Sequence, residues 1–134
     1  MSETGLIALA GIHHVRLPVS DLRRSIAFWA DFLGYEVNFE FPGEDGPLGV
    51  ALKHSNGGPN VVLWRDPVRA KQSSGFPWFA VGCRDADEIR ALQAQFDAHG
   101  VANGGIQTAF VGIKLPFVED PDGNLIGFYV VSAD

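Results

Sequence analysis

One strand-helix-strand pattern occurs twice in this chain of 134 residues. In the first copy, every second residue over positions 14–19 is apolar, as in a strand with one buried face. Asp21 then offers an N-cap side chain, apolar residues recur at helical spacing, and Gly34 supplies a C-cap. In the second copy, Asp85 follows Asp21 by 64 residues and Gly100 follows Gly34 by 66 residues. A repeat of this length predicts two similar modules.

Further strands are predicted after each helix, so both halves have the order strand, helix, strand, strand, strand. In the first half, strands are expected at residues 35–41, 48–54 and 60–65. In the second half, strands are expected at residues 76–83, 105–110, 114–119 and 125–132, with a helix over 85–99. One helix can cover only one face of its sheet, so the other face is expected to line a cavity. We therefore predict an α+β fold of two βαβββ modules that form a concave, partly open mixed β-sheet, with one helix per module outside.

The length indicates a single domain over residues 1–134. Within it, we expect module 1 at about 11–66, a linker at about 66–75 that is rich in charge, Ser, Pro and Gly, and module 2 at about 76–132. Residues 1–5 are expected to be a loose leader.

Charge and cysteine content narrow the possible partners. The net charge of −6 argues against a nucleic-acid groove, which needs clustered Lys and Arg. The single cysteine, Cys83, excludes an internal disulfide and indicates a reducing compartment; we expect it to pack beneath the second helix. No apolar run approaches the roughly 20 residues of a membrane span. We predict a cytoplasmic protein that binds neither nucleic acid nor membrane.

Two motifs resemble a known family. The first reads HVxLxVxDLxxSIxFWxxxLG from His14 to Gly34, and the second reads FxxDPDGNxI from Phe117 to Ile126. Together with the repeat, they resemble the paired βαβββ modules of the vicinal oxygen chelate superfamily. That superfamily includes glyoxalase I, bleomycin-resistance and fosfomycin-resistance proteins and extradiol dioxygenases, and the resemblance covers residues 11–132. Turn chemistry by itself is expected to explain Asp120 and Asp122.

The resemblance implies a metal site that this chain does not reproduce. Metal-using members place ligands on the first and last strand of each module. The four positions here hold His14, Val62, Trp78 and Gly127. Only His14 offers a donor atom, and a divalent cation needs several O or N ligands. We predict no cofactor; the alternative is a divalent metal in a shifted site that uses His13, His54 or Glu119.

Strand alternation predicts which side chains line the cavity. The inward positions hold His14, Arg16, Asn60, Val62, Trp64, Trp78, Gly127 and Tyr129. Such an aromatic trough, with one cation and one titratable group, suits a planar ligand that carries a carboxylate or hydroxyl. The alternatives are that Arg16 pairs with an acid at the rim, and that the tryptophans pack a module or subunit interface.

Three functions are compatible with these residues. The first is a metal-free small-molecule-binding protein that holds an aromatic or drug-like ligand in a trough completed by the second subunit of a homodimer. The second is a lyase, isomerase or dioxygenase that has an altered metal site or uses His14 as a general base. The third is an interaction module with a collapsed cavity. Loss of the ligand set favours the first over the second.

Overall fold

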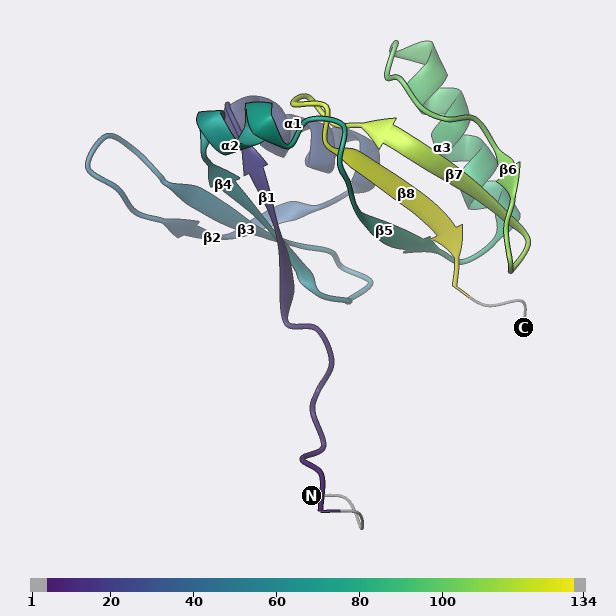
Figure 1. The fold of residues 1–134 in the computed structure, drawn as a ribbon, viewed down its shortest axis with the longest axis horizontal. Helices are drawn as coiled ribbons and strands as arrows, with labels where there is room; N and C mark the ends of the chain where they lie inside the picture. Colours follow the sequence, from purple (N-terminus) through teal and green to yellow (C-terminus); the bar gives the residue numbers. More distant parts are fainter. Residues whose placement is uncertain (1–4, 132–134) are drawn as a thin grey trace.

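The structure, a computed structural model, consists of two four-stranded sheets (Figure 1). It describes residues 5–131. Residues 1–4 of the leader predicted at 1–5, and the predicted strand end at Ser132, lie outside the described residues.

The first sheet is built around the first repeated motif. It contains β1 (His14–Val19), β2 (Glu36–Phe41), β3 (Gly49–Lys53) and β4 (Asn60–Arg65) in the order β1-β4-β3-β2, with α1 (Leu22–Leu33) after β1. Strand β1 is parallel to β4, and the other pairs are antiparallel. The α1 boundaries follow from capping: the carboxylate of Asp21 accepts a hydrogen bond from the Arg24 amide at 3.1 Å, and Gly34 has φ 74°.

The second sheet repeats this topology. It contains β5 (Pro77–Cys83), β6 (Gln107–Thr108), β7 (Ile113–Glu119) and β8 (Leu125–Val130) in the order β5-β8-β7-β6, with α3 (Ala86–Ala98) after β5. Strand β5 is parallel to β8, as β1 is to β4. The predicted duplication of a βαβββ module is therefore confirmed.

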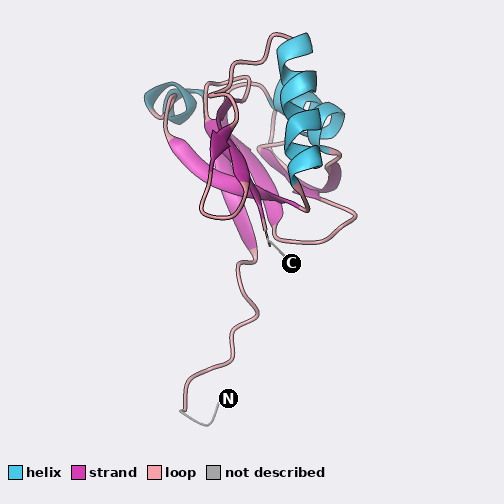
Figure 2. Cartoon of the chain, turned by 90° about the vertical axis from the view of Figure 1, so that its right-hand side faces the viewer, coloured by secondary structure: helices cyan, strands magenta, loops and turns pink. Residues whose placement is uncertain are grey.

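One hydrophobic core continues across both modules. Helices α1 and α3 cover one side of the sheets (Figure 2), and the strands of residues 5–131 do not form a closed barrel. The helices contact each other through aromatic rings: Phe96 lies 6.2 Å from Phe28 and 5.2 Å from Phe32, measured between centroids. Trp29 is fully buried between the modules and stacks on Phe79. The opposite faces of both sheets remain open.

The structure differs from the predicted elements in two places. The expected linker contains a helix, α2 (Pro67–Gln72), which begins because Asp66 accepts a hydrogen bond from the Arg69 amide at 3.0 Å and Pro67 occupies the first turn. The strand predicted at 105–110 shrinks to β6, since Gly105 on its N-terminal side has a left-handed φ of 73°. Among the helices of residues 5–131, none is long and apolar enough to cross a membrane.

The DPDGN turn between β7 and β8 connects the modules, which the sequence did not predict. The Asp122 carboxylate accepts hydrogen bonds from the Ser20 amide at 3.1 Å and from the Ser20 hydroxyl at 2.6 Å. The buried Asn124 side chain donates to the Pro18 carbonyl at 3.0 Å and to Asp120 Oδ2 at 2.9 Å. The expectation that turn chemistry alone explains Asp122 was wrong, because its partner Ser20 lies at the end of β1. For Asp120 the expectation is confirmed, since among residues 5–131 its carboxylate accepts hydrogen bonds only from Asp122 and Asn124 within the turn.

Cys83 lies at the end of β5, beneath α3. Its side chain is 7% exposed and belongs to the core. Burial, together with the nearby carboxylates of Glu88 and Asp85, raises the pKa of the thiol to about 11. The prediction of a packed, unactivated cysteine is confirmed.

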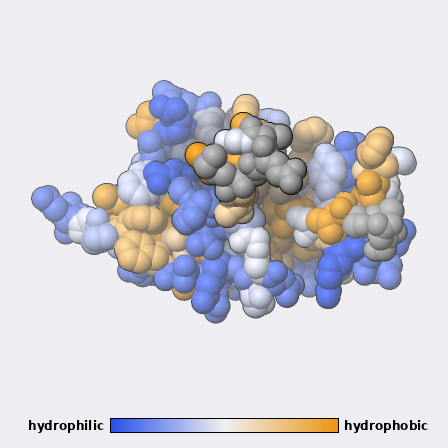
Figure 3. Space-filling view, turned by 90° about the horizontal axis from the view of Figure 1, so that it is seen from below, coloured by the Kyte–Doolittle hydropathy of each residue, from blue (hydrophilic) through white to orange (hydrophobic). Residues whose placement is uncertain are grey.

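The surface also contains apolar regions. Seen from below, apolar residues lie between more polar edges of the molecule (Figure 3). Exposed large apolar side chains occur on the N-terminal segment, on β2 and around β7. Apolar surface that gathers in this way marks candidate binding regions.

Candidate functional site on the open faces of the two sheets

The open face of module 1 carries a row of aromatic side chains. Strand register places Trp64 of β4 beside Gly49 of β3, and Gly49 beside Phe41 of β2. The ring centroids of Trp64 and Phe41 are 5.6 Å apart, and those of Phe41 and Phe39 are 5.0 Å apart. Phe39 is 53% exposed. The result is an apolar surface from β4 to the edge strand β2, available for stacking.

Arg16 supplies the positive charge of this face. Its Cζ atom lies 4.8 Å from the centroid of the Trp64 ring, within cation–π range. Among residues 5–131, no carboxylate lies within ion-pair distance of the Arg16 guanidinium. The alternative prediction, that Arg16 pairs with an acid at the rim, is therefore wrong for the described residues. A guanidinium without an ion pair beside a half-buried indole is a suitable partner for an anionic group on a flat ligand.

Gly49 makes room for the indole. A Cβ atom at this position would lie 2.6 Å from Cε3 of Trp64 and 2.7 Å from the Leu63 carbonyl oxygen. Any larger residue would displace the Trp64 ring or the backbone. The position of the Trp64 ring on this face thus depends on a glycine whose role no local sequence pattern predicts.

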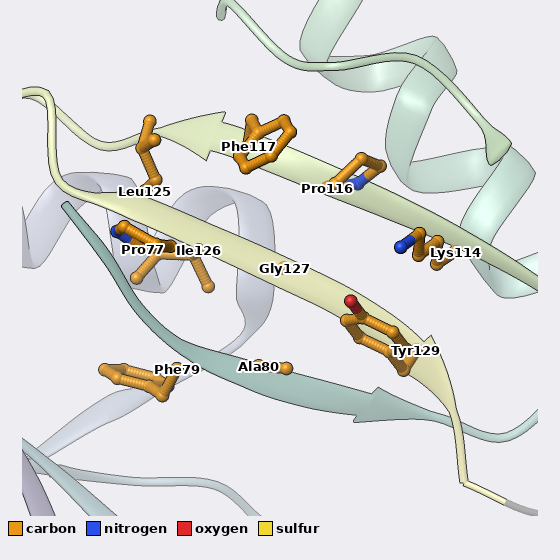
Figure 4. Close-up of a pocket in the computed structure, with 10 residues that line it drawn as sticks. All are labelled: Pro77, Phe79, Ala80, Lys114, Pro116, Phe117, Leu125, Ile126, Gly127 and Tyr129. Atoms are coloured by element: carbon orange, nitrogen blue, oxygen red, sulfur yellow. The ribbon is translucent and has the colours of Figure 1, made fainter. Parts of the chain in front are cut away.

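The open face of module 2 holds a cavity of about 450 Å³ around Tyr129 (Figure 4). Lys114 Nζ lies 5.6 Å from the Tyr129 ring centroid, and Gly127 and Ala80 form the floor between the strands. Phe117 completes one wall: a bulge in β7 between Leu115 and Val118 leaves Phe117 with φ 57°, a strained value for a residue with a side chain. Its ring lines the cavity and is about half exposed. The other lining residues are Pro77, Phe79, Pro116, Leu125 and Ile126.

Comparison with known proteins assigns the chain to a family. The family model of the Glyoxalase/Bleomycin resistance protein/Dioxygenase superfamily matches residues 11–128. The chain belongs to this superfamily. The match begins three residues before β1 and ends within β8, so it includes both repeated modules.

Solved structures of the superfamily have the same fold. TnmS3, an antibiotic binding protein from Streptomyces sp. CB03234, is 23% identical, covers 95% of this chain and 100% of its own, and superposes with a TM-score of 0.73. A glyoxylase/bleomycin resistance protein/dioxygenase domain from Frankia sp. EAN1pec is 18% identical over 92% of this chain and 98% of its own, with a TM-score of 0.75. The fosfomycin resistance protein FosX from Listeria monocytogenes is 16% identical over 93% of this chain and 96% of its own, with a TM-score of 0.73. No curated protein sequence matches the chain.

The donor set does not fit the metal that many superfamily members use. Of the four ligand positions, only His14 carries a donor, and its Nδ1 lies 3.0 Å from Nδ1 of the neighbouring His13. In the part of the chain that is described, no group of three or more His, Cys, Asp or Glu side chains is arranged to hold a metal ion. His54 instead accepts a hydrogen bond from the Asn56 amide at 3.1 Å and contacts Tyr35, so it does not join the histidine pair in a shifted site.

The structure divides the predicted site residues between two surfaces. His14, Arg16, Asn60, Val62 and Trp64 lie on the open face of module 1, and Gly127 and Tyr129 lie on that of module 2. Within one chain, the cavity at Tyr129 is lined by none of the first five. The expected single cavity is therefore not formed by one copy, because the sheets are separate.

Trp78 has a different place from the one that strand alternation predicts. A register irregularity between Pro77 and Phe79 interrupts the alternation of β5 at this residue. The indole nitrogen of Trp78 donates to Asn124 Oδ1 at 2.9 Å, and the ring packs against the core. Trp78 does not line the module 2 cavity. Its contact with Asn124 instead helps to hold the DPDGN turn.

Sequence reasoning also missed Phe39 and Phe41. Their strand shows the period-2 pattern Val37, Phe39, Phe41, which was available as a signal. What the sequence could not show is that pairing of β2 with β3 and of β3 with β4 brings Phe41 to Trp64, with Phe39 beside Phe41.

Proposed function

We propose that this protein binds a flat, aromatic or drug-like small molecule that carries a negative charge, and that it does so without a metal ion. The observation that carries this proposal is the module 1 face, where Arg16, without an ion pair, lies over Trp64 beside the half-buried Phe41 and the exposed Phe39. A stacked aromatic ring contributes on the order of 0.5–1.5 kcal/mol beyond area burial. A charge-assisted bond from Arg16 contributes roughly 1.5–3 kcal/mol more.

The names of two structural neighbours agree with this class of function. TnmS3 is described as an antibiotic binding protein and FosX as a fosfomycin resistance protein. At such low sequence identity, these neighbours support only the fold. The proposed ligand class therefore rests on the chemistry of the module 1 face. The lone His14 among the four ligand positions supports a metal-free site.

We further propose a homodimer in which a second copy covers the open face. Neither face is enclosed in one copy: module 1 presents an exposed aromatic surface and module 2 an open cavity. A second copy that brings its Tyr129 cavity toward Trp64 would unite the two groups of predicted site residues. The single buried cysteine agrees with a cytoplasmic location, which stays a prediction.

An enzyme that uses His14 as a general base is the second candidate. Its supporting observation is the contact between the Nδ1 atoms of His13 and His14 at 3.0 Å, on exposed side chains at the start of β1. Two imidazoles in this contact can share one proton. Turnover of a bound ligand that is abolished in His14→Gln but not in His13→Gln would favour this candidate.

Isothermal titration with a panel of aromatic carboxylic acids and their neutral methyl esters tests the binding proposal. We expect acids to bind more tightly than esters, and Trp64→Ala to weaken binding about tenfold or more. Phe110→Ala is the control, since this ring is fully exposed in the turn before β7 and does not line the module 2 cavity. Equal binding by wild type and Trp64→Ala would overturn the site. Near-equimolar divalent metal that survives dialysis, measured by elemental analysis, would overturn the metal-free part.

A further inference from the structure

Phe117 has an unusual backbone conformation for a residue with a large side chain. Among residues 5–131, it is the only residue other than glycine with a positive φ, at 57°. A Cβ atom in this left-handed region crowds its own backbone, so a phenylalanine stays there only where its surroundings hold it. Strained residues of this kind gather at ligand sites, where the strain fixes a side chain in place.

The bulge in β7 keeps the Phe117 ring on the open face of module 2. Leu115 and Val118, on either side of the bulge, are both fully buried and pair with alternate residues of β8. The two residues between them, Pro116 and Phe117, therefore face the single residue Gly127. In a strand without the extra residue, Phe117 would point into the core together with Leu115. With it, the ring stays on the open face and is 51% exposed.

The loop before β6 closes the space behind this ring. The Gly104 amide donates a hydrogen bond to the Pro116 carbonyl at 2.8 Å. A Cβ atom at Gly104 would lie 3.0 Å from Cδ2 of Phe117 and 2.9 Å from the carbonyl oxygen of Pro116. Phe117 lines the module 2 cavity, whereas Gly104 does not. The ring is therefore held between this loop and the cavity, and it cannot withdraw unless the loop moves.

The module 2 cavity has a charged end and an apolar end (Figure 4). Lys114 and Tyr129 lie at one end, Phe117 and Leu125 lie at the other, and Gly127 lies between them. Among residues 5–131, no carboxylate lies within ion-pair distance of the Lys114 ammonium. An acid that places its carboxylate at Lys114 therefore directs its apolar part along the cavity toward the Phe117 ring.

We propose that Phe117 limits the length of the ligand: its ring closes the apolar end of the module 2 cavity, so the cognate class is a compact aromatic carboxylate. A longer apolar group would have to displace a ring that is held on both sides. The proposed homodimer brings the charged end toward Trp64, so Arg16 and Lys114 can share the carboxylate. The inference rests on the proposed function, since it concerns part of the same ligand site.

Isothermal titration with benzoate and its para-alkyl derivatives, from methyl to hexyl, measures this length limit. For wild type, we expect the affinity to rise with short chains and to fall once the chain reaches the ring. Phe117→Gly should bind the longest members at least about tenfold more tightly than wild type, the effect of burying roughly two more methylene groups. Phe110→Ala is the control and should keep the wild-type limit, because this exposed ring does not line the cavity.

Urea denaturation tests the backbone part of the proposal without a ligand. Glycine tolerates a positive φ, so Phe117→Gly should have a higher urea midpoint than Phe117→Ala. The order should reverse at Phe110, which lacks a positive φ, so Phe110→Ala should have a higher midpoint than Phe110→Gly. A midpoint of Phe117→Ala equal to or above that of Phe117→Gly would overturn the inference that a left-handed backbone holds the ring.

Failure of the length limit and failure of the proposed function give different results. If the para-alkyl series has the same limit in Phe117→Gly as in wild type, while benzoate binding still depends on Trp64, the length limit is wrong and the proposed function stands. If no acid of the series binds to wild type, the proposed function fails and the length limit fails with it.

Discussion

The open faces of the two modules have the same construction and different chemistry. Each places an aromatic ring on its last strand and a cation against that ring: Arg16 on Trp64 in module 1, and Lys114 on Tyr129 in module 2. The cations come from different strands, since Arg16 lies on β1 and Lys114 on β7. The β1 position of Arg16 corresponds to Ala80 on β5. Duplication thus preserves topology and register, while the face residues differ independently.

The two faces also differ in shape for a physical reason. In module 1, β2 and β3 add phenylalanines and a glycine, which together extend the aromatic surface away from Trp64. In module 2, the β7 bulge raises Phe117 beside Gly127, which makes a cavity. We expect module 1 to supply most of the stacking with a ligand, and module 2 to select ligands by size.

The connection between the modules can be broken at Asp122. Asp122→Ala removes both hydrogen bonds from Ser20 and leaves the half-buried Ser20 amide without this acceptor, which should cost about 2–3 kcal/mol in the free energy of unfolding. Urea denaturation measures the loss. Asp87→Ala is the control, because Asp87 forms an exposed ion pair with Arg90 that contributes little. An equal loss in both variants would contradict a role for the DPDGN turn in joining the modules.

Glycines under the two aromatic rings provide a matched pair. Gly49→Ala is expected to lower the free energy of unfolding by about 1–3 kcal/mol, because the new Cβ meets both the Trp64 ring and backbone. Gly127→Ala should cost less, since its Cβ would lie 3.1 Å from Cε1 of Tyr129, an atom of a side chain that can shift. Urea denaturation of both variants decides the comparison. If Gly127→Ala lowered the free energy of unfolding more than Gly49→Ala, the packing around Gly49 in module 1 would not be the tighter of the two.

The two cations are predicted to contribute unequally to ligand affinity. Arg16→Gln should weaken binding of an aromatic carboxylate by about tenfold, whereas Lys114→Gln should weaken it only by about threefold, because a guanidinium forms bidentate bonds to a carboxylate. Isothermal titration measures both. The methyl ester of the same acid is the internal control, since its affinity should respond less to either change. A larger effect at Lys114 would move the primary site to module 2.

The smallest predicted effect is a pH dependence of stability that arises from Asp120 in module 2. Burial raises the pKa of the Asp120 carboxyl above its ordinary value of 3.8, despite hydrogen bonds from Asn124 and Asp122 that lower it. The folded protein therefore holds this proton more tightly than the unfolded chain does. The resulting stability is complete below pH 3.8 and is lost as the pH rises through the folded-state pKa.

Thermal unfolding measured between about pH 3 and pH 6, the range in which carboxyl groups ordinarily titrate, tests this pH dependence of stability. Wild type should lose stability with rising pH relative to Asp120→Asn, which has no group to titrate there, even if the variant is less stable throughout. The corresponding turn of module 1, SNGGP at 55–59, contains no acidic residue, so it adds no comparable pH dependence of stability. Parallel pH profiles for the two proteins would contradict the prediction.

Local sequence patterns by themselves determined the elements and their repetition. Asp21, Asp85 and Gly34 occupy the predicted capping positions, because capping depends on residues within one turn of the helix end. The inward phase of Arg16 and Trp64 also followed from alternation within a single strand. The prediction that Val62, Trp78 and Gly127 occupy metal-ligand positions of the family rested on the sequence alone, and it stays a prediction.

Only the tertiary structure decided how these elements combine into surfaces. An irregularity at Trp78 changed which way one strand presents its side chains, and no period-2 pattern reveals such an irregularity. Phe41 reaches Trp64 only through the pairing of three strands, and Asp122 reaches Ser20 across 102 residues of sequence. Such contacts join residues that are distant in the chain, so their geometry depends on the packing of whole modules and not on any local preference.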